Sequence, residues 1–225
     1  LALWFSVITP KALLLDLDGT LLESEKLWFI AEQRLMSRYG QTWTVEDQRH
    51  CVGGPLSRVA DYMELRINGA QSSSIIGAEL LREVGSLFES EPIQWRPGAQ
   101  ALVIQAHELE IPTVIVTASW RVLLDSVMSR MSETVGEFTL SVAGDEVNNS
   151  KPHPEPYLSA AAGVGIAIEQ CLAIEDSHTG TLSAVNAGAK VIAVAHMQPI
   201  EIPGAVILKT LEGQDVESLW MLVNN

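Results

Sequence analysis

The sequence predicts an α/β protein whose core is a doubly wound parallel sheet, interrupted after the first strand by a helical insertion. Two patterns along the 225 residues carry this prediction. From Pro97 onward, short apolar runs alternate with segments that have apolar residues at helical spacing, as expected for repeated strand–helix units. Residues 23–91, in contrast, contain no strong strand run. Because repeated strand–helix units build parallel sheets, the two patterns together predict one sheet and one insertion.

The first predicted strand is the apolar run at residues 13–15, which leads into Asp16-Leu17-Asp18-Gly19. A buried parallel strand is continuously apolar, because helices cover both of its faces. Helices of the insertion are indicated by three groups of apolar residues at three- and four-residue spacing: Leu27, Ile30, Ala31 and Leu35; Val59, Tyr62, Met63 and Leu65; and Ile75, Ile76, Leu80 and Leu81. Gly40, residues 53–55 and residues 68–69 separate these groups.

The remaining elements alternate along the chain. We predict helices at residues 99–109, 122–131, 154–163, 179–187 and 216–223, and strands at residues 113–117, 138–143, 171–174, 191–195 and 205–208. Prolines at the start of the 154–163 segment suit the first turn of a helix. An insertion directly after the first strand would overhang the carboxyl ends of the strands, where open α/β sheets bind their ligands.

Size, charge and cysteine content restrict the possible functions. A chain of 225 residues with 47% hydrophobic residues can form one large domain or two modest ones. A formal net charge of −14 argues against a nucleic-acid partner, and a small anionic substrate would need a local cation such as a metal ion. Cys51 and Cys171 lack metal-ligand spacing, so we expect buried reduced thiols of a cytoplasmic protein, with a disulfide as the alternative.

No segment of the sequence indicates a membrane. Residues 1–8 are apolar but too short to cross a bilayer, and no basic segment precedes them. We expect them to form an edge strand or a lead-in to the first strand. Neither a membrane nor a nucleic acid is therefore expected as a partner.

Two carboxylates at the end of a buried strand are the first chemical signal. Asp16 and Asp18 are one residue apart, and like charges this close repel each other unless a cation or a proton intervenes. A divalent metal that acts with the carboxylates on a substrate would explain the pair. An ordinary Asp-Gly turn at a strand end would need neither metal nor substrate, so the rest of the chain must decide.

Three further strand ends or loops carry polar residues. Thr117-Ala118-Ser119 precedes a predicted helix, so its hydroxyl and free N–H groups form either an anion site or an ordinary helix cap. Lys151 lies in a loop with prolines at 152, 154 and 156, which fix the backbone and favour a positioned charge over a solvated one. Glu175-Asp176-Ser177 is a second acidic pair at a strand end, or again a cap for the next helix.

Taken in order, Asp-x-Asp-Gly-Thr, Thr-x-Ser, Lys-Pro-x-Pro and Glu-Asp-Ser resemble the motifs of the haloacid dehalogenase superfamily of phosphotransferases. The resemblance covers roughly residues 11–196. Within the superfamily, the chain resembles the branch that contains β-phosphoglucomutases and sugar-phosphate phosphatases. It implies a Rossmann-like core domain at residues 1–22 and 93–225. It also implies that residues 23–92 are a helical cap domain.

The resemblance implies a role for each carboxylate. Asp16 would be the nucleophile that forms an aspartyl-phosphate, and the Asp18 side chain would be the general acid and base. Mg²⁺ would bind Asp16, the Asp18 backbone carbonyl and Asp176, with Glu175 as a further ligand or an orienting residue. Lys151 would neutralise the nucleophile and the transferring phosphoryl group.

The same resemblance implies a set of phosphoryl-binding groups. Thr117 would hold a phosphoryl oxygen through its hydroxyl, and Ala118 and Ser119 would do so through backbone N–H groups. Backbone N–H groups near Leu17 and Gly19 would complete the set.

Several other residues are candidates for substrate contact or support. In the cap, Trp28, Arg49, Arg58 and Glu23 are candidates to face the substrate, and Arg58 is as well explained by exposure to solvent. The turn at residues 53–55 resembles the cap loop that relatives use for specificity. His178 is the histidine nearest the crevice and a candidate to orient Glu175 or Asp176.

The predicted function is a Mg²⁺-dependent phosphatase that hydrolyses a small phosphorylated metabolite resembling a sugar phosphate. A phosphomutase of the β-phosphoglucomutase kind is the alternative, although those mutases carry a histidine at the position of Trp28. A catalytically silent binding module is a further alternative, which the intact motifs disfavour. Dehalogenases lack the second aspartate, and phosphonate-cleaving relatives need a cap lysine for which Lys26 lies too early. We expect a monomer, with a homodimer as the alternative.

Overall fold

The core is one parallel six-stranded sheet with the strand order β3-β2-β1-β4-β5-β6. The computed structural model describes residues 9–51, 55–196 and 199–225. The strands are β1 (Ala12–Leu15), β2 (Thr113–Val116), β3 (Leu140–Val142), β4 (Cys171–Glu175), β5 (Lys190–Val194) and β6 (Ala205–Leu208). All neighbouring pairs are parallel. This is the strand order of Rossmann-type folds, and it confirms the predicted fold class.

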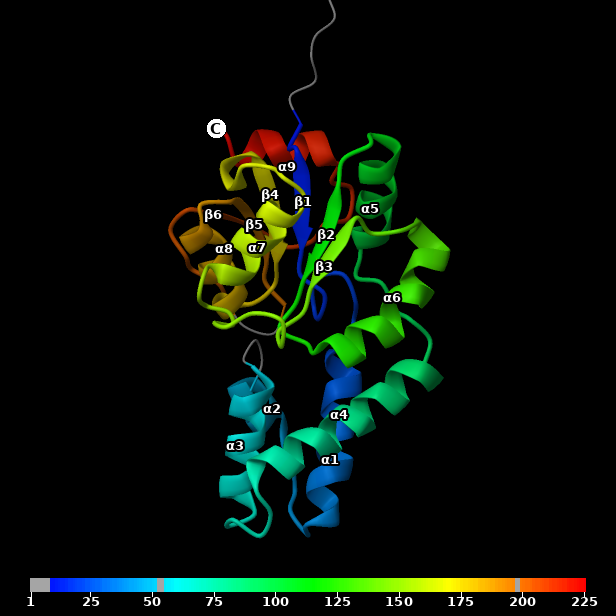
Figure 1. Cartoon of the computed structure of the whole chain (residues 1–225), viewed down its shortest axis with the longest axis vertical. Coiled ribbons are helices and arrows are strands. Elements are labelled where there is room, and N and C mark those ends of the chain that lie inside the picture. The colour runs from blue at the N-terminus through cyan, green and yellow to red at the C-terminus, as the bar shows by residue number, and fades with distance from the viewer. Residues whose placement is uncertain (1–8, 52–54, 197–198) are drawn as a thin grey trace, which may run out of the picture.

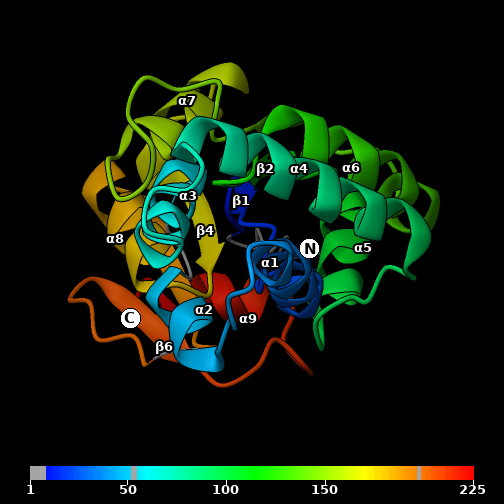
Figure 2. The ribbon, with the colours of Figure 1, turned by 90° about the horizontal axis from the view of Figure 1, so that it is seen from below.

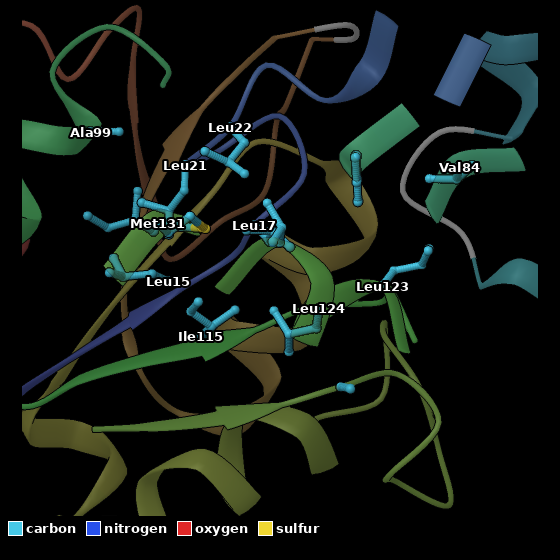
Figure 3. Close-up of a cluster of buried hydrophobic side chains, with 14 of the residues drawn as sticks. Leu15, Leu17, Leu21, Leu22, Val84, Ala99, Ile115, Leu123, Leu124 and Met131 are labelled. Atoms are coloured by element: carbon cyan, nitrogen blue, oxygen red, sulfur yellow. The ribbon is translucent and has the colours of Figure 1, made fainter. Parts of the chain in front are cut away.

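Helices cover both faces of the sheet, because successive side chains of each strand point to opposite faces. Leu13 and Leu15 of β1 belong to one hydrophobic cluster, shown in part in Figure 3, and Ala12 and Leu14 belong to another. The first cluster includes residues of α5 (Ala99–Glu108), α6 (Arg121–Val135) and α9 (Val216–Leu222). The second includes residues of α7 (Glu155–Gly163) and α8 (His178–Ala187), and the short 3₁₀ helix η1 (Ile168–Gln170) precedes β4.

Among the described residues, four helices between β1 and α5 form the predicted insertion. They are α1 (Glu25–Arg38), α2 (Val45–Cys51), α3 (Leu56–Arg66) and α4 (Ser73–Ser90). Figure 1 shows them grouped below the sheet, beyond the end of β1. Helix α4 packs against both α1 and α6, and Figure 2 shows it running alongside α6. The first hydrophobic cluster therefore continues from the sheet into the insertion, through residues such as Leu35 and Val84.

The two segments that connect the insertion to the sheet lie side by side. The backbone N–H of Glu23 donates to the Gln94 carbonyl, and that of Arg96 donates to the Leu21 carbonyl, both at 2.8 Å. The guanidinium of Arg96 also pairs with the Glu23 carboxylate. The chain therefore leaves the sheet and returns to it at one place.

Some of the predicted helical faces are wrong in detail. Leu65 is 74% exposed and Ile75 is 44% exposed, although their spacing predicts a buried face for both. Leu65 follows the buried Met63 by two residues and Ile75 directly precedes the buried Ile76, so each lies on a different side of its helix. The strand predicted at residues 138–143 is shorter, because it is an edge strand whose pairing with β2 begins at Leu140.

Three further predictions concern the cysteines, the glycine turn of the insertion and membrane spans. Cys51 and Cys171 are buried and free, as predicted. The expectations for residues 1–8 and for Gly53 and Gly54 lie outside the described part of the chain. None of the described helices is both long enough and apolar enough to cross a bilayer.

Candidate active site

The motif residues meet at the carboxyl ends of three adjacent strands. In the sheet, β1 lies between β2 and β4, so the segments that follow these strands converge at one edge. Asp16 follows β1, Thr117 follows β2 and Glu175 ends β4. Lys151 comes from the loop before α7 and reaches the same place. The convergence of parallel strand ends is the reason that residues distant in sequence are neighbours here.

Three carboxylates at this edge of the sheet form a buried acidic cluster. One oxygen from each of Asp16, Glu175 and Asp176 lies within 4.8 Å of the others. Burial, followed by the charge of Glu175, raises the pKa of Asp16 to about 7. Burial and the charge of Asp16 raise the pKa of Asp176 well above its usual value. Three buried carboxylates with one ammonium leave an excess of negative charge, so this oxygen-rich cluster fits a divalent cation.

Lys151 is that ammonium. Its Nζ donates to Asp16 Oδ1 at 2.8 Å, to Glu175 Oε1 at 2.6 Å and to the Val116 carbonyl at 2.7 Å. Burial alone would lower the pKa of Lys151, but the negative charges of Asp16 and Glu175 outweigh it and raise the pKa above its usual value. The amine is therefore charged and fully hydrogen-bonded, as the prediction of a positioned lysine requires.

The Glu175 carboxylate is held from several sides. The Tyr157 hydroxyl donates to Oε1 at 2.8 Å, and the Ser177 hydroxyl and the Asp176 N–H donate to Oε2 at 3.1 and 3.2 Å. A Cβ at Gly180 would lie 1.8 Å from Oε1, so only glycine fits beside the carboxylate. Tyr157 was not among the predicted site residues, and the signal was its place directly after Pro156, the last of the three prolines that follow Lys151.

The turn after β1 depends on Gly19. This residue has φ +84°, and a Cβ there would lie 2.1 Å from Asp176 Oδ2. Its N–H donates to the Leu22 carbonyl at 2.8 Å. In this structure the turn itself uses the Gly19 N–H, and phosphoryl binding by N–H groups near Leu17 and Gly19 stays a prediction. The N–H of Leu17 has no acceptor among the described residues, so it remains a candidate.

The Asp18 carboxylate does not join the acidic cluster but bridges the sheet and the insertion. Its Oδ1 accepts from Ser24 Oγ at 2.5 Å and from Trp28 Nε1 at 3.1 Å. Its Oδ2 accepts from Ser119 Oγ at 2.6 Å and from Thr117 Oγ1 at 3.4 Å. Donors from both sides thus orient this side chain, and the prediction could not foresee Ser24 because it matches no motif.

The segment after β2 offers fewer free donors than predicted. The Ser119 N–H donates to Thr117 Oγ1 at 3.0 Å, so this N–H belongs to the local turn. Among the described residues, the Ala118 N–H has no acceptor. Ala118, Thr117 and Ser119 all line one cavity with Asp16 and Asp18. In this structure the free donors of the predicted anion site are therefore the N–H groups of Leu17 and Ala118.

The insertion supplies the opposite wall of that cavity, and only one of the predicted cap residues lines it. Trp28 does. Arg58 is exposed and donates to the Cys51 carbonyl at 2.9 Å, at the end of α2. Glu23 pairs with Arg96 between the connecting segments, and Arg49 is exposed on α2. In this structure neither Arg58 nor Glu23 lines the cavity, so a contact of either with the substrate stays a prediction.

The prediction for His178 is also wrong. Its side chain is exposed at the start of α8, and no described hydrogen bond joins it to Glu175 or Asp176. Ser177 and Tyr157 hold Glu175 instead. Proximity in sequence did not indicate the direction in which the imidazole points.

Comparison with known proteins agrees with this geometry. The family model described as haloacid dehalogenase-like hydrolase matches residues 13–194. The chain belongs to this family. Among curated relatives, protein CbbY of Rhodobacter capsulatus is 32% identical over 191 residues, which are 81% of this chain and 84% of that protein. Hexitol phosphatase B of Escherichia coli is 28% identical over 192 residues, which are 83% and 85% of the two chains.

Solved structures show the same fold. The structure of a CbbY variant from Rhodobacter sphaeroides in complex with xylulose-(1,5)bisphosphate has a TM-score of 0.82 at 25% identity. The match covers 93% of this chain and 99% of that one. A β-phosphoglucomutase from Clostridium difficile has a TM-score of 0.79 at 19% identity, with 96% and 97% covered. These haloacid dehalogenase-like relatives therefore share both the sheet and the insertion.

Proposed function

We propose that this haloacid dehalogenase-like hydrolase is a phosphatase that cleaves a small phosphorylated metabolite resembling a sugar phosphate, through an aspartyl-phosphate at Asp16. The observation that carries the proposal is the contact of Lys151 Nζ with both Asp16 and Glu175, in an acidic cluster that borders the cavity. Relatives that are named phosphatases, hexitol phosphatase B among them, support the reaction class. We also propose the division into a core at residues 1–22 and 93–225 and a cap at residues 23–92.

Mg²⁺ is the cation that we propose for the acidic cluster. Asp16, Asp176 and the Asp18 backbone carbonyl would hold it, with Glu175 as a ligand or an orienting residue. Hard oxygen ligands of this kind suit Mg²⁺. When bound, it would neutralise part of the charge that otherwise repels the phosphoryl group from Asp16.

In the first step Asp16 attacks phosphorus and the bond from phosphorus to the ester oxygen breaks. A carboxylate oxygen of Asp16 forms the new bond, and the leaving oxygen takes a proton from Asp18. Trp28 and Ser119 hold the Asp18 carboxylate beside the cavity. Lys151 stays against the nucleophile, where its charge lowers the energy of the transferring group.

In the second step water replaces Asp16 on phosphorus. Asp18, which lost its proton in the first step, accepts one from the water as the oxygen attacks. The bond between Asp16 and phosphorus breaks, and inorganic phosphate leaves with the carboxylate restored. One proton therefore passes through Asp18 in each turnover, from water to the alcohol product.

A phosphomutase is the alternative, and the environment of Asp18 disfavours it. Mutases that resemble this chain carry a histidine at the position of Trp28. Here an indole fills the position, and its N–H donates to Asp18 Oδ1 at 3.1 Å. An indole N–H is only a donor and does not titrate, so it cannot exchange a proton with Asp18.

The proposal is tested by phosphate release from a panel of sugar, polyol and nucleotide monophosphates, with Mg²⁺ and with a chelator. We expect metal-dependent release by the wild type and none by Asp16→Asn. Asp61→Asn, a change on the exposed face of α3, is the matched control. Acid quench with ³²P-labelled ester should trap a hydroxylamine-sensitive phosphoprotein in the wild type only. Turnover by folded Asp16→Asn, or isomerisation of a hexose phosphate without phosphate release, would contradict the proposal.

A further inference from the structure

The wall of the cavity that the insertion supplies has an unusual charge. Its lining residues come from all four helices of the insertion: Glu25, Trp28, Glu32, Gln48, Cys51, Leu56, Val59 and Leu81. Among the described lining residues, the one basic side chain is that of Lys151, on the opposite wall. All three N–H bonds of Lys151 are used by Asp16, Glu175 and the Val116 carbonyl. Among the described residues, this wall therefore combines two carboxyl groups and the Gln48 amide with apolar surface, and none of its lining side chains is a cation.

Glu32 is the most constrained of these carboxylates. It is 3% exposed, and Trp43 Nε1 donates to its Oε2 at 2.8 Å. Trp43 is itself buried in the insertion, so it holds the carboxylate from inside the insertion. Oε1 has no donor among the described residues, and Glu32 lines the cavity. Among the described residues, Thr181 Oγ1 is the fully buried side-chain oxygen without a partner, so Glu32 Oε1 is open to the cavity. A ligand that brings an O–H group into the cavity would donate a hydrogen bond to this oxygen.

The ionisation of Glu32 supports the same conclusion. Burial raises the pKa of Glu32 to about 7, and the hydrogen bond from Trp43 offsets this only in part. A carboxyl group that lacks water and a counter-ion responds in this way. A second phosphate or a carboxylate of a substrate would find no cation to pair with among the described residues of this wall.

We propose that Glu32 is a specificity-determining residue that accepts a hydrogen bond from a hydroxyl group of an uncharged, polyhydroxylated leaving group. By the same electrostatics, the wall disfavours bisphosphates and phosphorylated carboxylic acids. The inference rests on the proposed phosphatase function and names the substrate class of that site. The leaving group is thus a sugar or sugar alcohol with a single phosphate.

The test compares kcat/KM for four monoesters that share the reacting phosphoryl group. Sorbitol 6-phosphate is the uncharged polyol, and xylulose 1,5-bisphosphate, phosphoglycolate and O-phosphoethanolamine carry a second phosphate, a carboxylate and an amine. We expect the wild type to prefer sorbitol 6-phosphate by at least about tenfold, as one hydrogen bond to a buried charged group permits. Glu32→Gln should reduce the preference over the bisphosphate about tenfold, chiefly through KM.

Two other variants separate recognition from general damage. Glu46→Gln removes the same charge from an exposed position on α2 and should leave all four ratios unchanged. Trp43→Phe replaces the indole with a smaller aromatic ring and removes the N–H that holds Glu32, so it should shift the ratios in the same direction by a smaller factor. Circular dichroism reports whether each variant folds.

A binding measurement keeps the inference independent of turnover. With Mg²⁺ present, calorimetry on the Asp16→Asn variant should show that sorbitol 6-phosphate binds, and that adding Glu32→Gln weakens the Kd about tenfold. If no ester is hydrolysed but this binding pattern holds, the proposed function fails and the inference stands. Unchanged ratios and Kd in folded Glu32→Gln, or a wild-type preference for the charged or amine-bearing esters, would overturn the inference.

Discussion

The two walls of the cavity differ in how far their polar groups are satisfied within the protein. On the sheet side, Asp16, Lys151 and Glu175 hydrogen-bond one another and their neighbours. On the insertion side, Glu32 has one described partner and an oxygen left over. The phosphoryl group is the same in every monoester, so a rigid, saturated network suits it. The leaving group varies from one monoester to another. In our proposal it completes the hydrogen bonds of the insertion wall, where Glu32 Oε1 has no described donor.

The largest effect should come from the residue that joins the two walls. Asp18→Asn keeps the size of the side chain but removes its capacity to carry a proton, so kcat should fall about 10²- to 10⁴-fold. Stopped assays of phosphate release would measure this, with Asp61→Asn as the control for a change of charge. A higher KM with an unchanged kcat would instead assign Asp18 to substrate binding. The proposed difference between the two walls would then be contradicted.

A glycine pair tests how rigid the sheet side is. Gly19→Ala would bring a Cβ to 2.1 Å from Asp176, whereas Gly40 has a similar φ of +68° and open space around its missing Cβ. Both changes strain a left-handed residue, but only the first displaces a proposed metal ligand. We expect Gly19→Ala to lower activity or metal affinity about 10- to 100-fold. Titration of activity with Mg²⁺ measures the difference, and equal effects of the two changes would argue against a rigid site.

On the insertion side, the buried Glu32 should make the free energy of unfolding depend on pH. The folded pKa of Glu32 is raised from 4.5 to about 7, so the native state binds a proton more tightly than the unfolded chain. Its contribution is therefore present below pH 4.5 and is lost as pH rises through 7. Glu32→Gln does not titrate, so its advantage in free energy of unfolding should grow from near zero at pH 4.5 to about 2 kcal/mol at pH 8.

Urea unfolding at both pH values measures that change. Glu46→Gln should show no such dependence, because the residue is exposed. A Glu32→Gln variant that is less stable than the wild type at pH 8 would show that the carboxylate is already satisfied inside the protein. The contrast between the two walls would then disappear.

The smallest expected effect concerns a partner of the saturated network. Tyr157→Phe removes the hydroxyl that donates to Glu175 Oε1, but Lys151 still donates to the same oxygen. We therefore expect a loss of about 1 kcal/mol in free energy of unfolding. Tyr39→Phe, which removes a longer 3.2 Å bond to Glu79 near the surface, is the matched control and should cost less. Equal losses would mean that burial adds little to this bond.

The sheet and the motif residues could be predicted because both depend on local patterns. Continuous apolar runs identified the strands, and parallel pairing then required that Asp16, Thr117 and Glu175 converge. Lys151 could be predicted because the prolines beside it fix the backbone. In each of these cases the position along the chain determines the position in space.

The insertion wall could not be predicted in this way. Helical spacing indicates a buried face but not what the face meets, so Glu32 resembled an ordinary surface residue of α1. The same limit explains why Arg58 was expected to face the substrate although it binds the end of α2. These orientations are set by packing between helices, which no motif encodes.

The pairing of the two connecting segments has a consequence for how such a protein can change. Because Glu23 and Gln94 are hydrogen-bonded neighbours, the segment between them begins and ends at one place beside the sheet, as a tight turn would. The entropy of closing that turn hardly depends on how many residues it contains. Helices can therefore be lengthened, shortened or transplanted from a relative between these two residues while the register of the strands is preserved. New leaving-group preferences can arise there while Asp16, Lys151 and Glu175 stay in place, provided that the donors to Asp18 on this segment, Ser24 and Trp28, are kept.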